Sequence, residues 1–198
     1  MKPKFDRERC LPFLLTAFVV LLDQGTKWLI ASRWPIGSRI WPAPEVFSPD
    51  NFLQIIHVRN LNLAFSLGRN LPEEAKQPLF VLLPIILLAT LIWYCIGYGR
   101  FTGLQRWMAA GFLGGGIGNM LDRVFRPEGV VDFISVRFYG IFGFRRWPAF
   151  NVADAGVVIC GLLLLFTVFL TVKKSKTFLP ETGPQETPSK PTFNGVNT

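Results

Sequence analysis

Four long apolar stretches divide the chain and predict its main elements. They run approximately from Leu11 to Ala31, from Pro78 to Tyr98, from Arg106 to Val124 and from Phe150 to Val172. Each has about 20 residues, the length at which an α-helix crosses a bilayer. The pattern therefore predicts a membrane α-helical fold with four transmembrane helices.

The two longer connections, residues 33–77 and 125–147, fall on the same side of the predicted bundle. In the first, Phe52 to Asn60 alternates weakly between apolar and polar residues, which predicts short strands. In the second, Val130 to Phe138 is rich in strand-forming residues, which fit either an extension of the sheet or a segment lying in the interface. Prolines and aromatic residues surround the first of these segments, which suits a structure at the headgroup level. We expect a small extracytoplasmic β-sheet and loop region at the membrane surface.

Composition supports a membrane protein. Hydrophobic residues make up 50% of the 198-residue chain, charged residues 17%, and the mean hydropathy is +0.35, which excludes an ordinary soluble domain. The formal charge is +8, but Lys and Arg are spread over termini and loops, so we expect anionic lipids and not nucleic acid as the counter-charge. The three cysteines are scattered and predict neither a disulfide framework nor a metal site.

Charge density favours one orientation. Basic residues divide almost evenly between the two sides, but Lys2, Lys4, Arg7 and Arg9 crowd the N-terminus, so we expect both termini in the cytoplasm and both long loops outside. Residues 1–176 then form one membrane domain. Residues 177–198 are rich in Pro, Thr, Glu and Asn without an apolar period, which predicts a disordered cytoplasmic tail.

Small residues in the third apolar stretch predict close helix contacts. Gly111 and Gly115, and Gly114 and Gly118, are four residues apart, and such pairs let a neighbouring backbone approach. A phosphate-binding loop is the rival interpretation of these glycines. It is disfavoured because no strand precedes them and no Lys-Ser/Thr pair follows.

Charged residues interrupt the first apolar stretch. Asp23 and Lys27 are four residues apart and share one helix face. They fit two interpretations equally: an internal ion pair near the outer interface, with Lys27 reaching toward the headgroups, or a polar wall of a functional site.

Further polar residues gather where the third helix ends and the fourth begins. Asn119, Asp122 and Arg123 close the third apolar stretch, Asp132 follows in the loop, and Asn151 and Asp154 open the fourth. Arg123 fits a salt bridge to Asp122, a lipid phosphate contact, or stabilisation of a nearby carboxylate. Carboxylates are costly at membrane depth unless they face a bundle interior or a wet cavity, so they call for a functional explanation.

The spacing of these residues leaves more than one function open. Two carboxylates sharing a proton are the working groups of an aspartic protease. Proton-coupled transport ranks nearly level, because transporters also bury carboxylates, and a structural membrane protein is a third possibility. His57, the only histidine, has no partner at ligand spacing. We expect it at the surface of a strand, and we expect no metal or other cofactor.

Five segments together resemble the successive sequence motifs of bacterial lipoprotein signal peptidase, also called signal peptidase II. They are DQGTK (Asp23 to Lys27), RNLNLAFSLG (Arg59 to Gly68), GGGIGNMLDR (Gly114 to Arg123), VVDFISV (Val130 to Val136) and PAFNVAD (Pro148 to Asp154). The resemblance covers Leu11 to about Val172. One departure is visible, because Asn62 stands where the family usually has a glycine.

The resemblance implies an aspartyl endopeptidase of the bacterial inner membrane. Such enzymes remove the signal peptide from prolipoproteins by cutting before a diacylglyceryl-modified cysteine. The family's catalytic aspartates fall on Asp132 and Asp154, and its supporting polar residues on Asp23, Asn60, Asn119, Asp122, Arg123 and Asn151. Lys27 joins this supporting set through its spacing from Asp23. We expect a monomer whose partners are prolipoproteins and membrane lipids.

Overall fold

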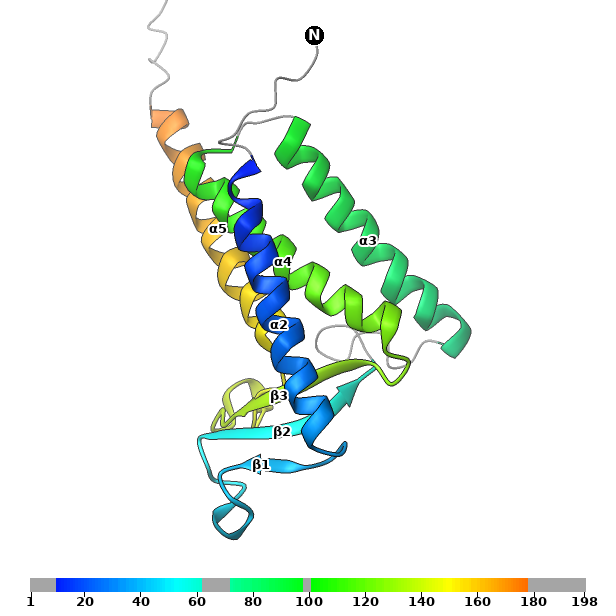
Figure 1. Ribbon diagram of the computed structural model, residues 1–198. Helices are drawn as coiled ribbons and strands as arrows, with labels where there is room; N and C mark the ends of the chain where they lie inside the picture. Colours follow the sequence, from blue (N-terminus) through cyan, green and yellow to red (C-terminus); the bar gives the residue numbers. More distant parts are fainter. Residues whose placement is uncertain (1–9, 62–71, 98–100, 178–198) are drawn as a thin grey trace, which may run out of the picture.

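Four long helices form a bundle, and a small sheet lies across one of its ends (Figure 1). The computed structural model describes residues 10–61, 72–97 and 101–177. Its long helices are α2 (Phe13–Arg33), α3 (Glu73–Gly97), α4 (Gly103–Phe125) and α5 (Val152–Thr177). Helix α4 contacts all three others. The predicted helical fold with a small sheet is confirmed.

Two of these helices carry the clearest membrane-span character. Phe13–Arg33 and Val152–Thr171 are long and apolar enough to cross a bilayer, whereas α3 contains a shorter apolar run, Val81–Cys95. Many of their large apolar side chains are exposed, among them Leu21, Phe18 and Leu165. Such surfaces suit a lipid environment and not water.

The glycines of α4 allow close helix packing. A Cβ atom on Gly111 would lie 2.4 Å from Cys160 Sγ of α5, and one on Gly115 would lie 2.3 Å from the Ala153 carbonyl oxygen. On another face of α4, a Cβ on Gly114 would lie 2.8 Å from Val19 Cβ of α2. The predicted role of these glycines in packing is confirmed.

Two helices begin earlier than predicted. Helix α4 starts at Gly103 and not Arg106, because the Thr102 hydroxyl accepts from the Gln105 backbone N–H (3.3 Å) and the Gln105 side chain accepts from the Thr102 N–H (3.0 Å). This reciprocal capping box has a readable sequence signature. Helix α3 starts at Glu73, five residues before the predicted Pro78. Acidic residues at 73 and 74 favour a helix start, whereas the prediction weighed only the prolines.

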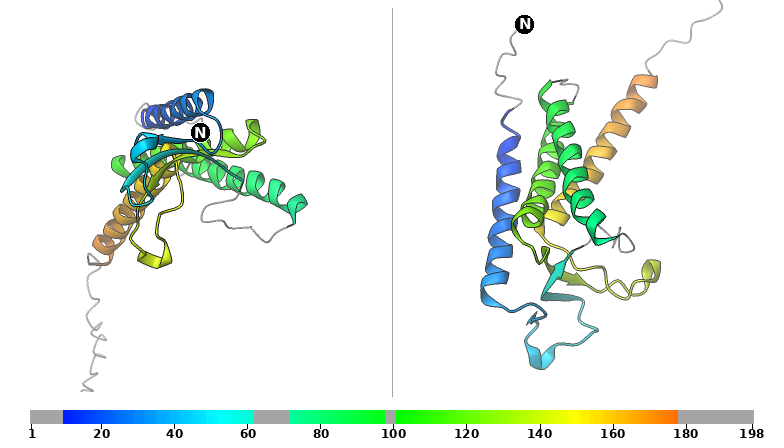
Figure 2. Two further views of the ribbon diagram at one scale, coloured as in Figure 1. Left: turned by 90° about the horizontal axis from the view of Figure 1, so that it is seen from below. Right: turned by 90° about the vertical axis from the view of Figure 1, so that its right-hand side faces the viewer.

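The sheet is antiparallel with strand order β1-β2-β3, formed by Arg39–Trp41, Leu53–Asn60 and Val130–Val136. The two predicted strand segments are therefore confirmed, and β1 is additional. Short 3-10 helices, Pro44–Val46 and Ile141–Gly143, lie in the connections. Figure 2 shows the sheet and its loops together at one end of the bundle.

Apolar packing fixes the sheet to the helices. Ile30 near the end of α2 packs with Val131 and Phe133 of β3, and Val152 at the start of α5 packs against the same cluster. In the β2–β3 ladder, Val58 pairs with Asp132 and Asn60 with Val130. This register brings Asn60 and Asp132 close together at the helix bundle.

His57 is not a surface residue, contrary to the prediction. Its side chain is 1% exposed, and its Nδ1 lies 2.8 Å from the Trp34 carbonyl oxygen at the end of α2. The reason is that the end of α2 lies directly over β2, so it covers the His57 side chain and buries it.

Candidate functional site

Asp132 lies on β3 and is buried, with 2% of its surface exposed. Its Oδ1 accepts a hydrogen bond from Asn151 Nδ2 (2.7 Å), and its Oδ2 accepts one from Asn60 Nδ2 (3.1 Å). The three residues come from β3, from the start of α5 and from β2. The pairing of β2 with β3 and the start of α5 thus place the Asn60 and Asn151 amides against the Asp132 carboxyl group.

The pKa of Asp132 is raised from 3.8 to about 7. Burial is the largest cause, because it disfavours the charged form, and the negative charge of Asp154 adds to it. The hydrogen bonds from Asn60 and Asn151 and the positive charge of Lys27 act in the opposite direction. Near neutral pH this carboxyl group is therefore able to hold a proton.

Asp154 lies in the first turn of α5, where it takes part in the helix cap. Asn151 Oδ1 accepts from the Asp154 backbone N–H (2.9 Å), and Asp154 Oδ2 accepts from the Asn151 backbone N–H (3.1 Å). The other oxygen, Oδ1, accepts from Asn119 Nδ2 at 2.6 Å. The positive end of a helix dipole favours an anion in this position.

Two buried amides connect the carboxyl groups of Asp132 and Asp154. Asn151 Nδ2 donates to Asp132 and also to Asn119 Oδ1 (3.0 Å), while Asn119 Nδ2 donates to Asp154. The chain of contacts is short, and the charge of Asp154 acts on Asp132. The structure therefore brings together two acidic side chains that are 22 positions apart in the sequence.

A second pair of carboxylates, Asp23 and Asp122, lies behind the first. Lys27 Nζ is 2.8 Å from Asp23 Oδ2, 3.1 Å from Asp122 Oδ2 and 2.9 Å from Asn119 Oδ1. Asp23, Lys27 and Asp122 all have 0% exposure. Lys27 therefore does not extend to the headgroups, and the ion pair is itself part of the wall behind the candidate site.

The arginines at the end of α4 do not pair as the salt-bridge alternative suggested. Arg126 Nη1, one turn after Asp122, contacts the carboxylate of Asp122. Arg123 instead donates from Nη1 to the Asn119 carbonyl oxygen (3.2 Å) and interacts electrostatically with Asp154 and Asp132. This position favours the interpretation in which Arg123 stabilises nearby carboxylates.

Comparison with known proteins identifies the family. Residues 15–170 match the family described as signal peptidase (SPase) II. The chain belongs to this family. It is 38% identical over 183 residues to the lipoprotein signal peptidase of Treponema pallidum, covering 91% of this chain and 95% of that protein. It is 43% identical over 166 residues to the lipoprotein signal peptidase of Treponema denticola, covering 84% and 92%.

Solved structures agree with this membership of the signal peptidase II family. One bacterial membrane enzyme superposes with a TM-score of 0.68 at 28% identity, covering 87% of this chain and 94% of the other. A second superposes with a TM-score of 0.65, also at 28% identity, covering 85% and 97%. The fold described above is therefore shared with solved bacterial membrane enzymes.

Two residues of this signal peptidase II chain contribute to the site region but were not selected from its sequence. Gln24 Nε2 donates to Asp23 Oδ2 (3.1 Å), to Asp122 Oδ1 (3.0 Å) and to the Gly118 carbonyl oxygen (2.9 Å). Arg126 contacts Asp122 from the next helical turn. The i,i+4 spacing of Asp122 and Arg126 was a usable signal, whereas no sequence spacing reveals the contacts of Gln24 across helices.

Asn62, the departure from the family pattern, lies outside the residues that the structure describes. Among the described residues, no three His, Cys, Asp or Glu side chains are grouped as metal ligands.

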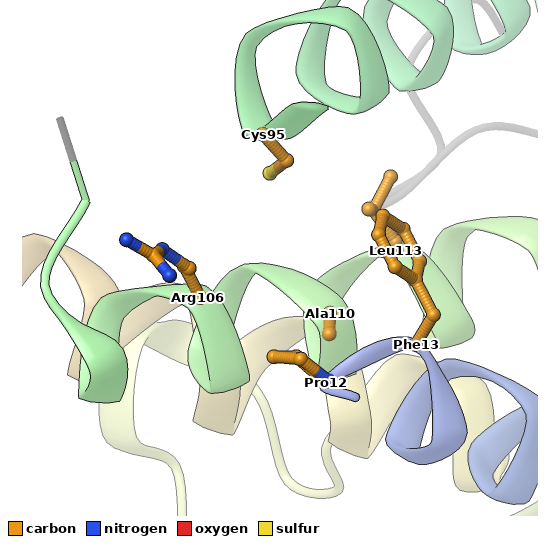
Figure 3. A pocket seen from close by; sticks show the side chains of 6 residues that line it. All are labelled: Pro12, Phe13, Cys95, Arg106, Ala110 and Leu113. Carbon is orange, nitrogen blue, oxygen red and sulfur yellow. The ribbon is translucent and has the colours of Figure 1, made fainter. Parts of the chain in front are cut away.

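A small cavity lies far from the carboxylates of the signal peptidase II site. Its volume is about 10 Å³, room for roughly one water molecule. It is lined by Pro12, Phe13, Cys95, Arg106, Ala110 and Leu113 (Figure 3). Its lining residue Leu113 and Asp122 are nine positions apart on α4, or roughly 14 Å along the helix axis. This cavity is too small and too distant to receive a peptide for the candidate site.

Proposed function

We propose that this chain is a lipoprotein signal peptidase that hydrolyses prolipoproteins with Asp132 and Asp154 as its catalytic pair. Two relatives at 38% and 43% identity are lipoprotein signal peptidases, which supports prolipoproteins as substrates. The aspartic mechanism rests on one observation: two carboxyl groups are joined through buried amides, and the pKa of one of them is about 7. One carboxyl group can therefore be neutral while the other is ionised.

The two environments assign a role to each aspartate. Asp132 is the more buried, and its raised pKa suits the protonated partner, which polarises the scissile carbonyl. Asp154 sits in the first turn of α5, where the positive end of the helix dipole favours the ionised partner. In this mechanism Asp154 removes a proton from a water molecule held between the two carboxyls. The resulting hydroxide attacks the carbonyl that precedes the lipidated cysteine. The C–N bond then breaks, and Asp154 returns its proton to the departing amine.

The polar residues around the pair hold it in place. Asn119 and Asn151 orient the two carboxyls, Arg123 offers positive charge nearby, and Asn60 approaches from β2. The diacylglyceryl chains of the substrate remain in lipid between helices. The sheet lies at one end of the bundle (Figure 1). Asp132 belongs to β3 and Asp154 to the first turn of α5, so the reaction occurs at the membrane surface.

A cleavage assay tests this function. Purified protein in detergent is given a diacylated prolipoprotein, with and without a chelator, and release of the signal peptide is measured. Asp132→Asn and Asp154→Asn each remove cleavage while the protein stays folded, and chelation has no effect. Asp50→Asn is the matched control, because its carboxylate is 64% exposed and pairs with Arg137. Normal processing by either of the first two variants contradicts the catalytic assignment.

We also propose that all four long helices span the bacterial inner membrane, with both termini cytoplasmic. The domain then covers residues 1–176, residues 177–198 are a cytoplasmic tail, and the chain acts as a monomer among lipids, without nucleic acid. The two clear spans and the apolar run in α3 support this topology. In a background with the native cysteines replaced by serine, a cysteine at the exposed Tyr139 position reacts with a membrane-impermeant thiol reagent from the outer side. Labelling only after cell lysis contradicts this orientation.

A further inference from the structure

Asp122 holds the backbone next to Asp132. Its Oδ2 accepts the Val131 backbone N–H at 3.1 Å, and this contact is buried. Val131 immediately precedes Asp132 on β3 and is itself 0% exposed. A carboxylate on α4 therefore fixes the main chain of the strand one residue before the first proposed catalytic aspartate.

Asp23 holds the backbone next to Asp154 in the same way. Its Oδ1 accepts the Ala153 backbone N–H at 2.9 Å, also in a buried contact. Ala153 immediately precedes Asp154 and is 0% exposed. The first turn of α5 is thus held by a carboxylate of α2. A Cβ on Gly118 would lie 2.7 Å from Asp23 Oδ2, so the absence of a side chain there makes room for this carboxylate.

Lys27 connects the two holding carboxylates. Its ammonium group has three N–H donors, and three acceptors surround it: Asp23 Oδ2, Asp122 Oδ2 and Asn119 Oδ1, at 2.8, 3.1 and 2.9 Å. The third acceptor belongs to the amide whose Nδ2 donates to Asp154. The contact from Lys27 therefore also fixes which end of the Asn119 amide points at Asp154.

Charge within this cluster is balanced. Asp23 and Asp122 carry two negative charges, and Lys27 and Arg126 carry two positive charges in direct contact with them. A buried ion pair is weak evidence for stability alone, since desolvation offsets much of its attraction. The backbone contacts at Val131 and Ala153 give the cluster a geometric role.

We propose that Asp23, Lys27 and Asp122 form a buried bridge that sets the position of Asp132 relative to Asp154. These three are positioning residues, since they act through the backbone and through Asn119. The inference rests on the proposed function, because it concerns the geometry of the same two aspartates. A misplacement of about 1 Å can cost about 100-fold in rate, so such a bridge matters for turnover.

The double variant Asp23→Asn/Lys27→Met tests the bridge. It removes one positive and one negative charge, and Asn retains an oxygen for the Ala153 N–H, so the main loss is the link to Asp122 and Asn119. We expect kcat to fall by about tenfold to 100-fold with KM changed by less than about threefold. Leu113→Ala is the stability-matched control, because Leu113 is fully buried on α4 and lines the distant cavity. Unchanged kcat in the double variant overturns the proposal. So does an equal loss of kcat in Leu113→Ala when the two variants have the same melting temperature.

A backbone substitution keeps the test decisive even where the double variant fails to fold. Replacing Val131 by its α-hydroxy acid changes its N–H to an ester oxygen and leaves every side chain in place. An ester at Ile134 is the matched control, since that N–H donates to the Phe150 carbonyl oxygen (2.8 Å) and not to Asp122. We expect the Val131 ester to lose kcat well beyond the Ile134 ester. Equal kcat in the two esters overturns the proposal.

Failure of the bridge and failure of the proposed function give different results. Asp132→Asn is assayed beside these variants on the same prolipoprotein. Cleavage by Asp132→Asn refutes the catalytic pair, and the bridge falls with it. An inactive Asp132→Asn together with a fully active double variant refutes the bridge alone.

Discussion

The proton on Asp132 makes stability depend on pH in a direction that can be measured. In the unfolded chain this carboxyl has its ordinary pKa of 3.8, whereas in the folded protein the pKa is about 7. Between these two values the folded state binds a proton that the unfolded state has released. The stabilising contribution is therefore complete below about pH 4 and is lost as the pH rises through 7.

The magnitude follows from the size of the change. A rise in pKa from 3.8 to about 7 corresponds to about 4 kcal/mol of differential free energy between the two protonation states. For a protein of this length, 1 kcal/mol shifts the melting temperature by about 2–4 °C. Asp132→Asn has no proton to release at this position. The difference in stability between wild type and variant should therefore fall by about 4 kcal/mol between pH 4 and pH 8.

Thermal unfolding in one detergent across this pH range measures the difference. The other titratable groups are present in both proteins, so their contributions are removed when the two curves are subtracted. Asp154→Asn is the informative control. It removes the second cause of the raised pKa but leaves burial, the largest cause, so the loss of stability should move to lower pH without disappearing. If wild type and Asp132→Asn keep a constant difference from pH 4 to pH 8, Asp132 holds no such proton and the reasoning fails.

Three other outcomes are expected. Lys27→Met leaves two buried carboxylates without their shared cation and should cost about 3–5 kcal/mol in the free energy of unfolding; an unchanged value contradicts the contacts. Gly115→Ala places a Cβ 2.3 Å from the Ala153 carbonyl oxygen and should lower the melting temperature, while Gly103→Ala, with nothing within 4 Å, should not. In pH–rate profiles, kcat/KM should fall as the pH rises through about 7, because Asp132 loses its proton; a rate that is constant from pH 6 to pH 9 argues against Asp132 as the acid.

The parts of the fold that depend on local pattern were predictable. Apolar runs of bilayer length gave the four helices to within five residues, weak alternation gave β2, and strand-forming residues indicated β3. Glycine spacing in α4 indicated close packing, which the contacts at Gly111 and Gly115 bear out. The earlier start of α4 was missed although Thr102 and Gln105 form a capping pair with a known sequence signature.

The parts that depend on distant contacts were not predictable from pattern. His57 becomes interior only because α2 ends over β2, and the Gln24 amide finds its partners on α4, 94 and 98 positions away. Spacing along the chain likewise could not show which acidic residues belong to the proposed catalytic pair and which support it. The assignment of Asp132 and Asp154 came from resemblance to the family's motifs, and it remains a prediction.

The kinds of partner around each carboxylate give a physical reason for dividing the acidic residues into two pairs. Asp23 and Asp122 directly contact an ammonium or a guanidinium group, so a full positive charge lies against each of them. In the described part of the chain, the hydrogen bonds to Asp132 and Asp154 come instead from amide N–H groups.

Neutral amides orient a carboxyl group but carry no full charge. Within the described ranges, the positive charge of Arg123 acts on both carboxyls electrostatically but without a direct ion pair to either. Two such carboxyls in a buried setting are therefore expected to share one proton, whereas two carboxylates held by cations are not. This end of the bundle thus holds two kinds of carboxyl pair. Asp23 and Asp122 are in contact with cations, whereas Asp132 and Asp154 can exchange a proton. Acid–base chemistry requires the second kind, and this requirement is why we place hydrolysis at Asp132 and Asp154 and positioning at Asp23 and Asp122.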